Sequence, residues 1–239
     1  MQNITLESLT KNKQYKYPYI LLSLYLTFLL STVCLAGRIT SIGNMLEPGG
    51  IFVFPLTFCI CDIVGEVYGY AYPRIFIWIG VLVEFIFSLI TILVSHFPTP
   101  DFFTNGHAYQ IVFDPTLRYV CSGLIGLLIG EFTNVYLLAK WKVAMQGKFF
   151  ILRAMGSTAF GQACLTIIVD LLNYTGKLGL SELGWMMMCG YMWKIFSALI
   201  LVFPAWLLVK YLKTIEQVDY YDINTNFNPF NFSIPSIRD

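Results

Sequence analysis

The chain has 239 residues, of which 57% are hydrophobic and only 12% are charged, and its formal net charge is +1. Because an average soluble domain carries roughly 25% charged residues, this composition excludes an ordinary soluble domain and indicates a polytopic membrane protein. The near-zero net charge argues against a nucleic-acid partner, which usually needs a basic face.

Apolar runs divide the sequence into six candidate membrane spans. A spanning helix needs ~20 mostly apolar residues, and the runs of this kind cover residues 18–37, 51–70, 75–95, 117–139, 153–174 and 185–211. The sequence therefore predicts an all-α integral membrane protein with six transmembrane helices in one bundle. The predicted transmembrane domain covers 18–213, between an N-terminal tail (1–17) and a C-terminal tail (214–239). We expect the first span to be retained, because no small-residue cleavage site follows it.

The distribution of Lys and Arg predicts the orientation of the spans. Of the 15 Lys and Arg residues, eleven lie in the terminal regions or in the loops that follow spans 2 and 4. Three lie on the opposite side, and Lys194 lies within a span. By the positive-inside rule, both termini are cytoplasmic. The C-terminal tail is rich in Asn and aromatic residues without periodicity, and we predict that it is loosely ordered.

The sequence predicts no cofactor, metal or catalytic site. The six cysteines all fall in apolar runs and are interpreted as small hydrophobic residues. His96 and His107 lie in a loop without companion ligands. There is no GxxxxGK[ST] phosphate loop, so we do not expect ATP hydrolysis by that route. An intramembrane enzyme is disfavoured, because no nucleophile, metal-ligand or protease signature accompanies the acidic residues.

The second span contains two acidic residues, Asp62 and Glu66, in the stretch "CDIVGEVYGY". On insertion scales each acid at a helix centre costs about 2.5–3.5 kcal/mol. Residues four apart share one helix face. Both carboxylates are therefore predicted to face the bundle interior, water or a partner, and not lipid.

Other spans also carry polar residues at helical spacing. Span 5 contains a stripe of polar residues spaced four apart, namely Thr158, Gln162, Thr166 and Asp170. Span 4 carries Gly126 and Gly130, a spacing typical of close helix contact, followed by Glu131 and Asn134. Span 3 carries Glu84 and span 6 carries Lys194. Ionisable residues within spans are candidates for function by default, and a purely structural protein would not need so many.

Each of these residues also has a structural interpretation. Asp62 could form an ion pair with Lys194, and Glu66 could reach headgroup water at the end of its span. Gln162 could hydrogen-bond to a neighbouring helix. Glu84 could have a structural partner, and Asp170 could lie at a solvated helix terminus.

The segment "FPLTFCICDIVGEVYGY" resembles the signature of the vitamin uptake transporter family, and in particular its queuosine precursor transporters. The residues that match are Phe54, Pro55, Thr57, Asp62, Glu66, Val67, Tyr68 and Gly69, with Arg74 as the basic residue that follows. Similar family patterns are present in "GSTAFGQ", preceded by Arg153, and in the last span at Lys194 and Pro204. Departures occur in span 4, where acid and amide are exchanged at Glu131 and Asn134, and in span 5, where Leu165 replaces an Asp. The resemblance covers nearly the whole chain apart from the tail.

The resemblance implies import of 7-cyano- or 7-aminomethyl-7-deazaguanine, which we expect to take place across the bacterial inner membrane and without a cofactor. Alternating access around a site near the membrane midplane is the ordinary mechanism for such import. A carboxylate accepts the two adjacent N–H donors of a guanine-like edge, and an amide can donate to its oxygen. An aromatic ring can stack on its face, and the candidates are Tyr68, Phe58, Tyr191 and Trp193. A cationic aminomethyl arm would favour a second carboxylate. The expected substrate-binding residues are Asp62, Glu66, Gln162, Lys194, Asn134 and Tyr68.

Energy coupling is left open between two forms. In the first, Glu66 or Glu131 changes protonation during the transport cycle, and Lys194 neutralises one acid in the empty state. In the second, uptake is not coupled to an ion, and intracellular consumption of the solute drives net import. The alternative function is a substrate-binding membrane subunit for another planar polar solute or vitamin, energised by a separate module. The sequence leaves open whether the chain is a monomer or a homodimer.

Overall fold

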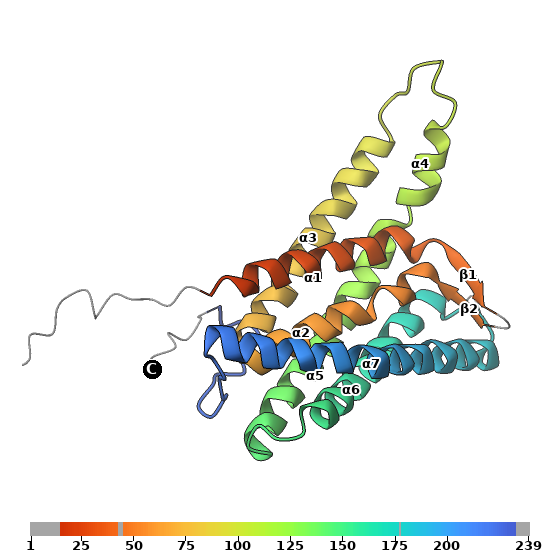
Figure 1. Ribbon diagram of the computed structural model, residues 1–239. Helices are drawn as coiled ribbons and strands as arrows, with labels where there is room; N and C mark the ends of the chain where they lie inside the picture. The colour runs from red at the N-terminus through yellow and green to blue at the C-terminus, as the bar shows by residue number, and fades with distance from the viewer. Residues whose placement is uncertain (1–14, 43–44, 177, 233–239) are drawn as a thin grey trace, which may run out of the picture.

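A computed structural model describes residues 15–42, 45–176 and 178–232, and these form a helical bundle with one small β-hairpin (Figure 1). The elements in chain order are α1 (Tyr17–Ala36), β1 (Ile39–Ile42), β2 (Met45–Pro48), η2 (Gly49–Phe52), α2 (Pro55–Tyr68), α3 (Ala71–Ser95), α4 (Gly106–Phe113), α5 (Thr116–Ala144), α6 (Phe150–Tyr174) and α7 (Leu180–Glu216). Six helical segments of the described chain are long and apolar enough to cross a membrane. The predicted six-span, all-α fold is confirmed.

The helix ends differ from the predicted spans because an apolar run reports the hydrocarbon core and not the whole helix. α5 has 29 residues and α7 has 37, and α7 continues past the predicted domain boundary at 213. α2 begins with Pro55, whose fixed φ suits a first helical turn. It ends at Gly69, where φ is +82°, a conformation that favours glycine.

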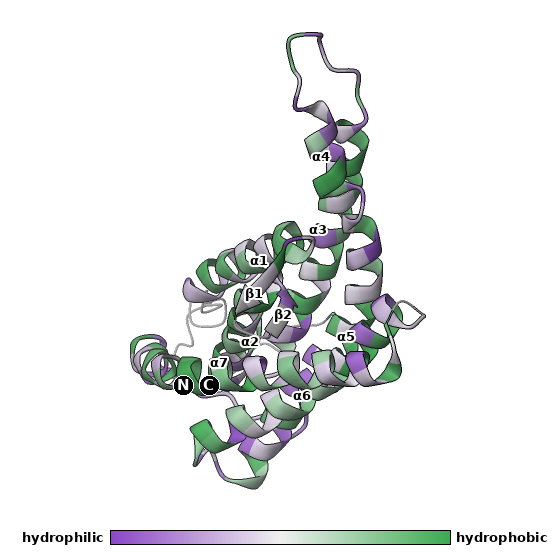
Figure 2. Ribbon diagram, turned by 90° about the vertical axis from the view of Figure 1, so that its right-hand side faces the viewer, coloured by the Kyte–Doolittle hydropathy of each residue, from purple (hydrophilic) through white to green (hydrophobic). Residues whose placement is uncertain are grey.

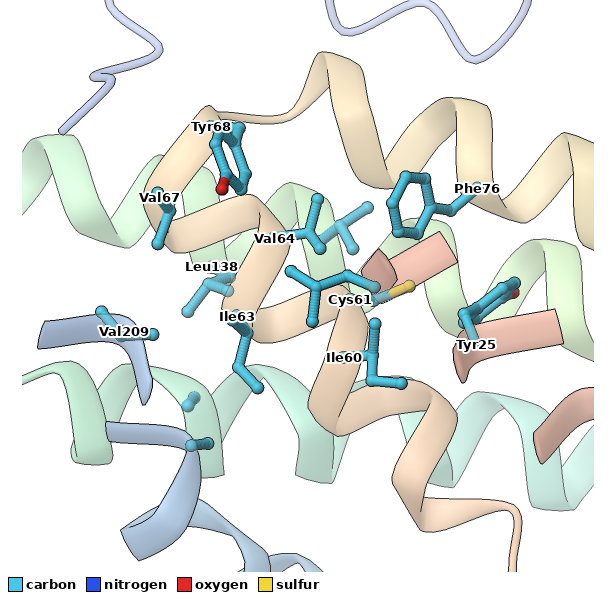
Figure 3. Packing of buried hydrophobic residues seen from close by; sticks show 14 of the residues in the cluster. Tyr25, Ile60, Cys61, Ile63, Val64, Val67, Tyr68, Phe76, Leu138 and Val209 are labelled. Atoms are coloured by element: carbon cyan, nitrogen blue, oxygen red, sulfur yellow. The ribbon is translucent and has the colours of Figure 1, made fainter. Parts of the chain in front are cut away.

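α2 is the central helix of the bundle. In an apolar stretch of 18 residues within its segment, Gly49–Tyr68, 72% of the residues are buried, against 22–39% in the corresponding stretches of the other five segments. Figure 3 shows side chains of α2, including Cys61 and Val64, beside Tyr25 of α1, Phe76 of α3 and Leu138 of α5. The surrounding helices therefore separate α2 from lipid, and they leave their own apolar side chains exposed on the outside.

The first and last described helices meet at one end of the bundle, which we call the tail end. The backbone N–H of Tyr17 donates to Oε1 of Glu216 (3.4 Å), and the rings of Tyr17 and Tyr211 are in contact. The opposite end, which carries the β1–β2 hairpin, is called the hairpin end. Six crossings explain why α1 starts and α7 finishes at the same end. That this end is cytoplasmic stays a prediction from the positive charges.

The C-terminal region is ordered where the structure describes it, so the prediction of a loose tail is wrong for residues 218–232, which we call the tail segment. The guanidinium of Arg74 donates to the carbonyl oxygen of Asn226 (3.0 Å), and the indole of Trp78 donates to that of Pro229 (2.8 Å). Asp222 accepts from the backbone N–H of Tyr70 (3.0 Å). Periodicity did not predict this, because the segment is held by backbone carbonyls and aromatic contacts.

The region between α3 and α5 is also more structured than predicted. Residues 96–116 were expected to be a loop, but they include the short helix α4. Figure 2 shows α4 and the end of α3 standing clear of the rest of the bundle, and α4 has no buried residue.

α5 and α6 approach closely through glycine, as the G-x-x-x-G spacing in span 4 predicted. A Cβ atom added to Gly130 would lie 2.8 Å from the carbonyl oxygen of Gly161, and one added to Gly161 would lie 2.6 Å from that of Gly130. Backbone oxygens cannot rotate away as side chains can. These two positions therefore need glycine for the helices to reach their observed distance.

We predict that Gly161→Ala destabilises the protein while Gly184→Ala, its matched control, does not. Alanine is a better helix former than glycine by about 0.8–1 kcal/mol, and a Cβ at Gly184 meets nothing within 4 Å. At Gly161 this gain is outweighed by overpacking of about 1–3 kcal/mol. Thermal unfolding of both variants in detergent checks the prediction, and a higher midpoint for Gly161→Ala would contradict the packing described here.

Candidate functional site

An inner cluster of polar side chains surrounds Asp62 at the middle of the bundle. Nδ2 of Asn134 on α5 donates to one carboxylate oxygen of Asp62 (2.7 Å), and the hydroxyl of Thr158 on α6 donates to the other (3.0 Å). All three residues are buried, and Asp62 is 5% exposed. Neutral partners therefore orient the carboxylate, and the described residues provide no salt bridge for it.

Gln162 completes the inner cluster, one helical turn from Thr158. Its side chain is 0% exposed, and neither its amide nitrogen nor its amide oxygen has a hydrogen-bond partner among the described residues. Asp62, Thr158 and Gln162 line a small inner cavity with Phe58 and apolar side chains of α7. The cavity volume is about 20 Å³, roughly the space of one water molecule. The site is thus polar and desolvated, but contracted in this conformation.

Glu131 lies on α5 one turn before Asn134, and it is fully buried. The thiol of Cys61 and the hydroxyl of Thr57 are beside its carboxyl group, but within the described part of the chain neither carboxyl oxygen has a partner at hydrogen-bonding geometry. The Thr57 hydroxyl instead donates to the carbonyl oxygen of Phe54 (2.7 Å). A buried carboxyl group without a cation is more stable with a proton than without one.

Glu66 is the centre of a tail-end ionic cluster, which comprises Glu66, Lys142, Arg153, Lys213 and Asp219. Arg153 binds Glu66 through both terminal nitrogens, at 2.7 and 3.1 Å, and Nζ of Lys213 lies 2.7 Å from Glu66 Oε1. Glu66 is 1% exposed, so the alternative in which it reaches headgroup water is wrong. Glu66 does not line the inner cavity. It forms a buried pair with Arg153, and both residues are part of the sequence resemblance described above.

Asp219 extends this cluster into the tail segment. Nζ of Lys142 lies 2.6 Å from Asp219, and Nζ of Lys213 lies 2.9 Å from it. Partial burial alone would raise the pKa of Asp219, but hydrogen bonds and charge interactions with Lys142 and Lys213 hold it below its usual value. The ionic cluster therefore joins α2, α5, α6 and α7 to the tail segment and closes the tail end.

A larger, outer cavity of about 170 Å³ lies at the hairpin end. Lys194 lines it and donates to the hydroxyl of Thr166 (2.8 Å). Among the described residues it forms no salt bridge, so the ion pair between Lys194 and Asp62 is not formed. The acidic residues that share this cavity with Lys194 are Glu47, Glu84 and Asp170. Asp170 therefore faces a cavity and not only solvent.

The other predicted residues lie away from both cavities. The hydroxyl of Tyr68 donates to Glu216, and its ring packs against Tyr15 and Tyr72. Tyr191 and Trp193, two further candidates for stacking on a base, line neither the inner nor the outer cavity. Of the candidate aromatic residues, Phe58 alone is beside Asp62 in the inner cavity.

Sequence reasoning missed Glu47 and the partners of Glu66. Glu47 precedes the "PGG" turn and was not within a predicted span, so nothing marked it as buried. Lys142 and Lys213 were interpreted as orientation signals at span ends, yet both side chains turn inward to Glu66. The available signal was the presence of a Lys or Arg at the tail end of each of α5, α6 and α7, the same end at which α2 carries Glu66.

We predict that Glu66→Gln lowers the unfolding temperature in detergent, because it leaves three buried or partly buried cations with Asp219 as their remaining acid. Removing one partner of a buried ion pair costs about 3–5 kcal/mol. Asp101→Asn removes one negative charge from an exposed position and is the matched control. An unchanged midpoint for Glu66→Gln would contradict the role given to the cluster.

Comparison with known proteins identifies a family for this chain. A family model described as "Putative vitamin uptake transporter" matches residues 48–209, which is more than half of the chain. The match includes the inner cluster, Glu66 and Lys194, whereas Glu47, Lys213 and Asp219 lie outside it. No curated protein and no solved structure matches the chain. This chain belongs to the vitamin uptake transporter family.

Proposed function

We propose that the protein is a secondary importer of 7-deazaguanine bases, the precursors of queuosine, in the bacterial inner membrane. The family supports uptake of a vitamin or other small molecule by a multi-pass membrane protein. The identity of the base comes from the signature residues around Asp62 and from the chemistry of the inner cluster. The base would bind there while the bundle alternates between two open ends.

The observation that carries the proposal is the unpartnered amide of Gln162 beside an oriented carboxylate. A carboxylate offers about four acceptor positions, and Asn134 and Thr158 fill two of those of Asp62. The remaining two suit the adjacent N–H donors of a guanine-like edge. The amide nitrogen of Gln162 can donate to the carbonyl oxygen of the same edge, and the ring of Phe58 can pack on the base.

The contracted inner cavity indicates that binding at Asp62 needs a more open conformation. In the described conformation a base does not fit in about 20 Å³, while the tail end is closed by the ionic cluster and the tail segment. Lining residues from α6 and α7, such as Thr158 and Val202, would have to separate. Alternating access around the inner cluster is therefore part of the proposal.

Proton coupling is assigned to Glu131 in this proposal, and not to Glu66. Glu66 has cation partners that stabilise its charge. Glu131 lacks them, lies one turn from Asn134 on α5, and can exchange a proton when the inner cluster becomes hydrated. The competing form is uncoupled uptake, in which intracellular consumption of the base drives net import.

We predict that Asp62→Asn lowers the affinity of purified protein for 7-cyano- and 7-aminomethyl-7-deazaguanine by about 100-fold, because two charge-assisted hydrogen bonds are lost. Isothermal titration against wild type measures this, with Gln162→Leu as a second variant and Asp101→Asn as the control. Retained affinity in Asp62→Asn would reject the carboxylate as the base-binding group. No binding of either base to folded wild type would reject the substrate.

We predict that Glu131→Gln retains binding but removes the response of uptake to a proton gradient. Proteoliposomes that contain only this chain measure initial uptake with and without a protonophore. Wild-type uptake that does not change with the protonophore favours the uncoupled form. Binding without any transport by the chain alone favours the alternative function, a binding subunit energised by a separate module.

A further inference from the structure

The outer cavity contains buried oxygen atoms that lack hydrogen-bond donors. Oε1 of Glu47 and Oδ1 of Asn173 line the cavity without a partner, and the two residues are only 5% and 7% exposed. A buried acceptor without a donor is unfavourable, and natural structures leave few of them. Both atoms need N–H or O–H groups, and the described protein atoms do not supply them.

The charges around the outer cavity are also unbalanced. Three carboxyl groups line it, those of Glu47, Glu84 and Asp170, against one ammonium group, that of Lys194. Lys194 donates to Thr166 and lies beyond salt-bridge distance of every described carboxylate. Burial raises the pKa of Glu47 to about 7, with Asp170 adding to the effect and Lys194 opposing it. The carboxyl groups of the outer cavity thus outnumber its one cation, and a bound cation would favour the charged form of Glu47.

The size and lining of the outer cavity suit a small ring compound. Its volume is about 170 Å³, and cavities of about 150 Å³ accept a benzene ring. Phe54, Tyr119 and Tyr174 are part of its lining. Aromatic rings attract a cation placed over their faces, and the attraction is stronger where water is excluded.

We propose that the outer cavity is a binding site for a planar organic cation with several N–H donors, held by Glu47, Asp170 and Asn173. The unpartnered oxygens would accept its N–H groups, and its charge would offset the excess of carboxylates. Neutral analogues of the same shape would bind more weakly, because they leave one carboxylate without a counter-charge.

The outer cavity is next to the inner cluster, so one solute could occupy the two in sequence. The rings of Phe54 and Phe58 are in contact, with centroids 5.6 Å apart, and Phe54 lines the outer cavity while Phe58 lines the inner one. Resting on the proposed function, the inference selects the cationic aminomethyl base over the neutral cyano base. The preference for a cation does not depend on that function.

The test compares cationic and neutral forms of two probe pairs, by titration of wild type, Glu47→Gln and the control Glu182→Gln. Benzamidine and benzamide have the same shape and differ in charge, and they carry no base-specific edge. The second pair is 7-aminomethyl- and 7-cyano-7-deazaguanine. Glu182 is exposed at the hairpin end, and Gln at its position keeps an acceptor for the helix cap.

We expect benzamidine to bind wild type at least 10-fold more tightly than benzamide, and Glu47→Gln to remove that difference while Glu182→Gln retains it. Asp170→Asn is the second variant, for use if Glu47→Gln does not fold. Equal affinity for the two benzene derivatives, or a preference that survives both variants, would overturn the inference. Binding of benzamidine without binding of either base would leave the outer site standing and reject the proposed function.

Discussion

The burial of two carboxylates on one short helix is the constraint on which the rest of the structure depends. Asp62 and Glu66 cannot face lipid without a cost of several kcal/mol, and α2 meets this constraint by lying inside the other helices. The surrounding helices then carry the lipid-exposed apolar surface. In α1, α3 and α7, only 22% of the residues in the apolar stretch are buried. The close α5–α6 contact through Gly130 and Gly161 brings Asn134 and Thr158 to the face of α2 that bears the acids.

The two carboxylates lie one helical turn apart, yet they have opposite kinds of partners. Glu66 has Arg153 and Lys213 within 3 Å, so its charge is compensated and its acceptor positions are largely occupied. Asp62 has hydrogen bonds from an amide and a hydroxyl, which orient it but leave its charge and half of its acceptor positions available. A fully compensated acid stabilises an end of the bundle, whereas a partly compensated one can select a ligand. The chemistry of the two sites differs because α5 and α6 present neutral side chains to Asp62 but cationic side chains to Glu66, where α7 adds Lys213.

Properties that depend on one helix at a time could be predicted, and partners from distant helices could not. Spacing placed Thr158, Gln162 and Thr166 on one buried face of α6, and composition predicted the six spans. The alternative in which Lys194 pairs with Asp62 was wrong, since no pattern within a helix fixes the depth at which two side chains meet. Lys142 and Lys213 were misread because a lysine at a span end can serve topology and also bind a buried acid. The tail segment escaped prediction because its contacts use backbone carbonyls, which are independent of sequence pattern.

Under the proposed alternating access, the tail end has to open, and the ionic cluster is suited to that requirement. Breaking a charge pair inside a dry core leaves both ions without partners and is strongly unfavourable. At the tail end, Asp219 and Lys213 are already partly exposed, at 40% and 22%, so water that enters on opening would solvate the separated charges. The free-energy cost of opening is then the difference between charges that are paired in the closed end and charges that are hydrated in the open end. It is smaller than the cost of leaving the same charges without partners in a dry core. A solute shifts a conformational equilibrium only by its difference in affinity for the two states. Binding of a solute at Asp62 could therefore open the tail end only if the free-energy cost of opening it is modest.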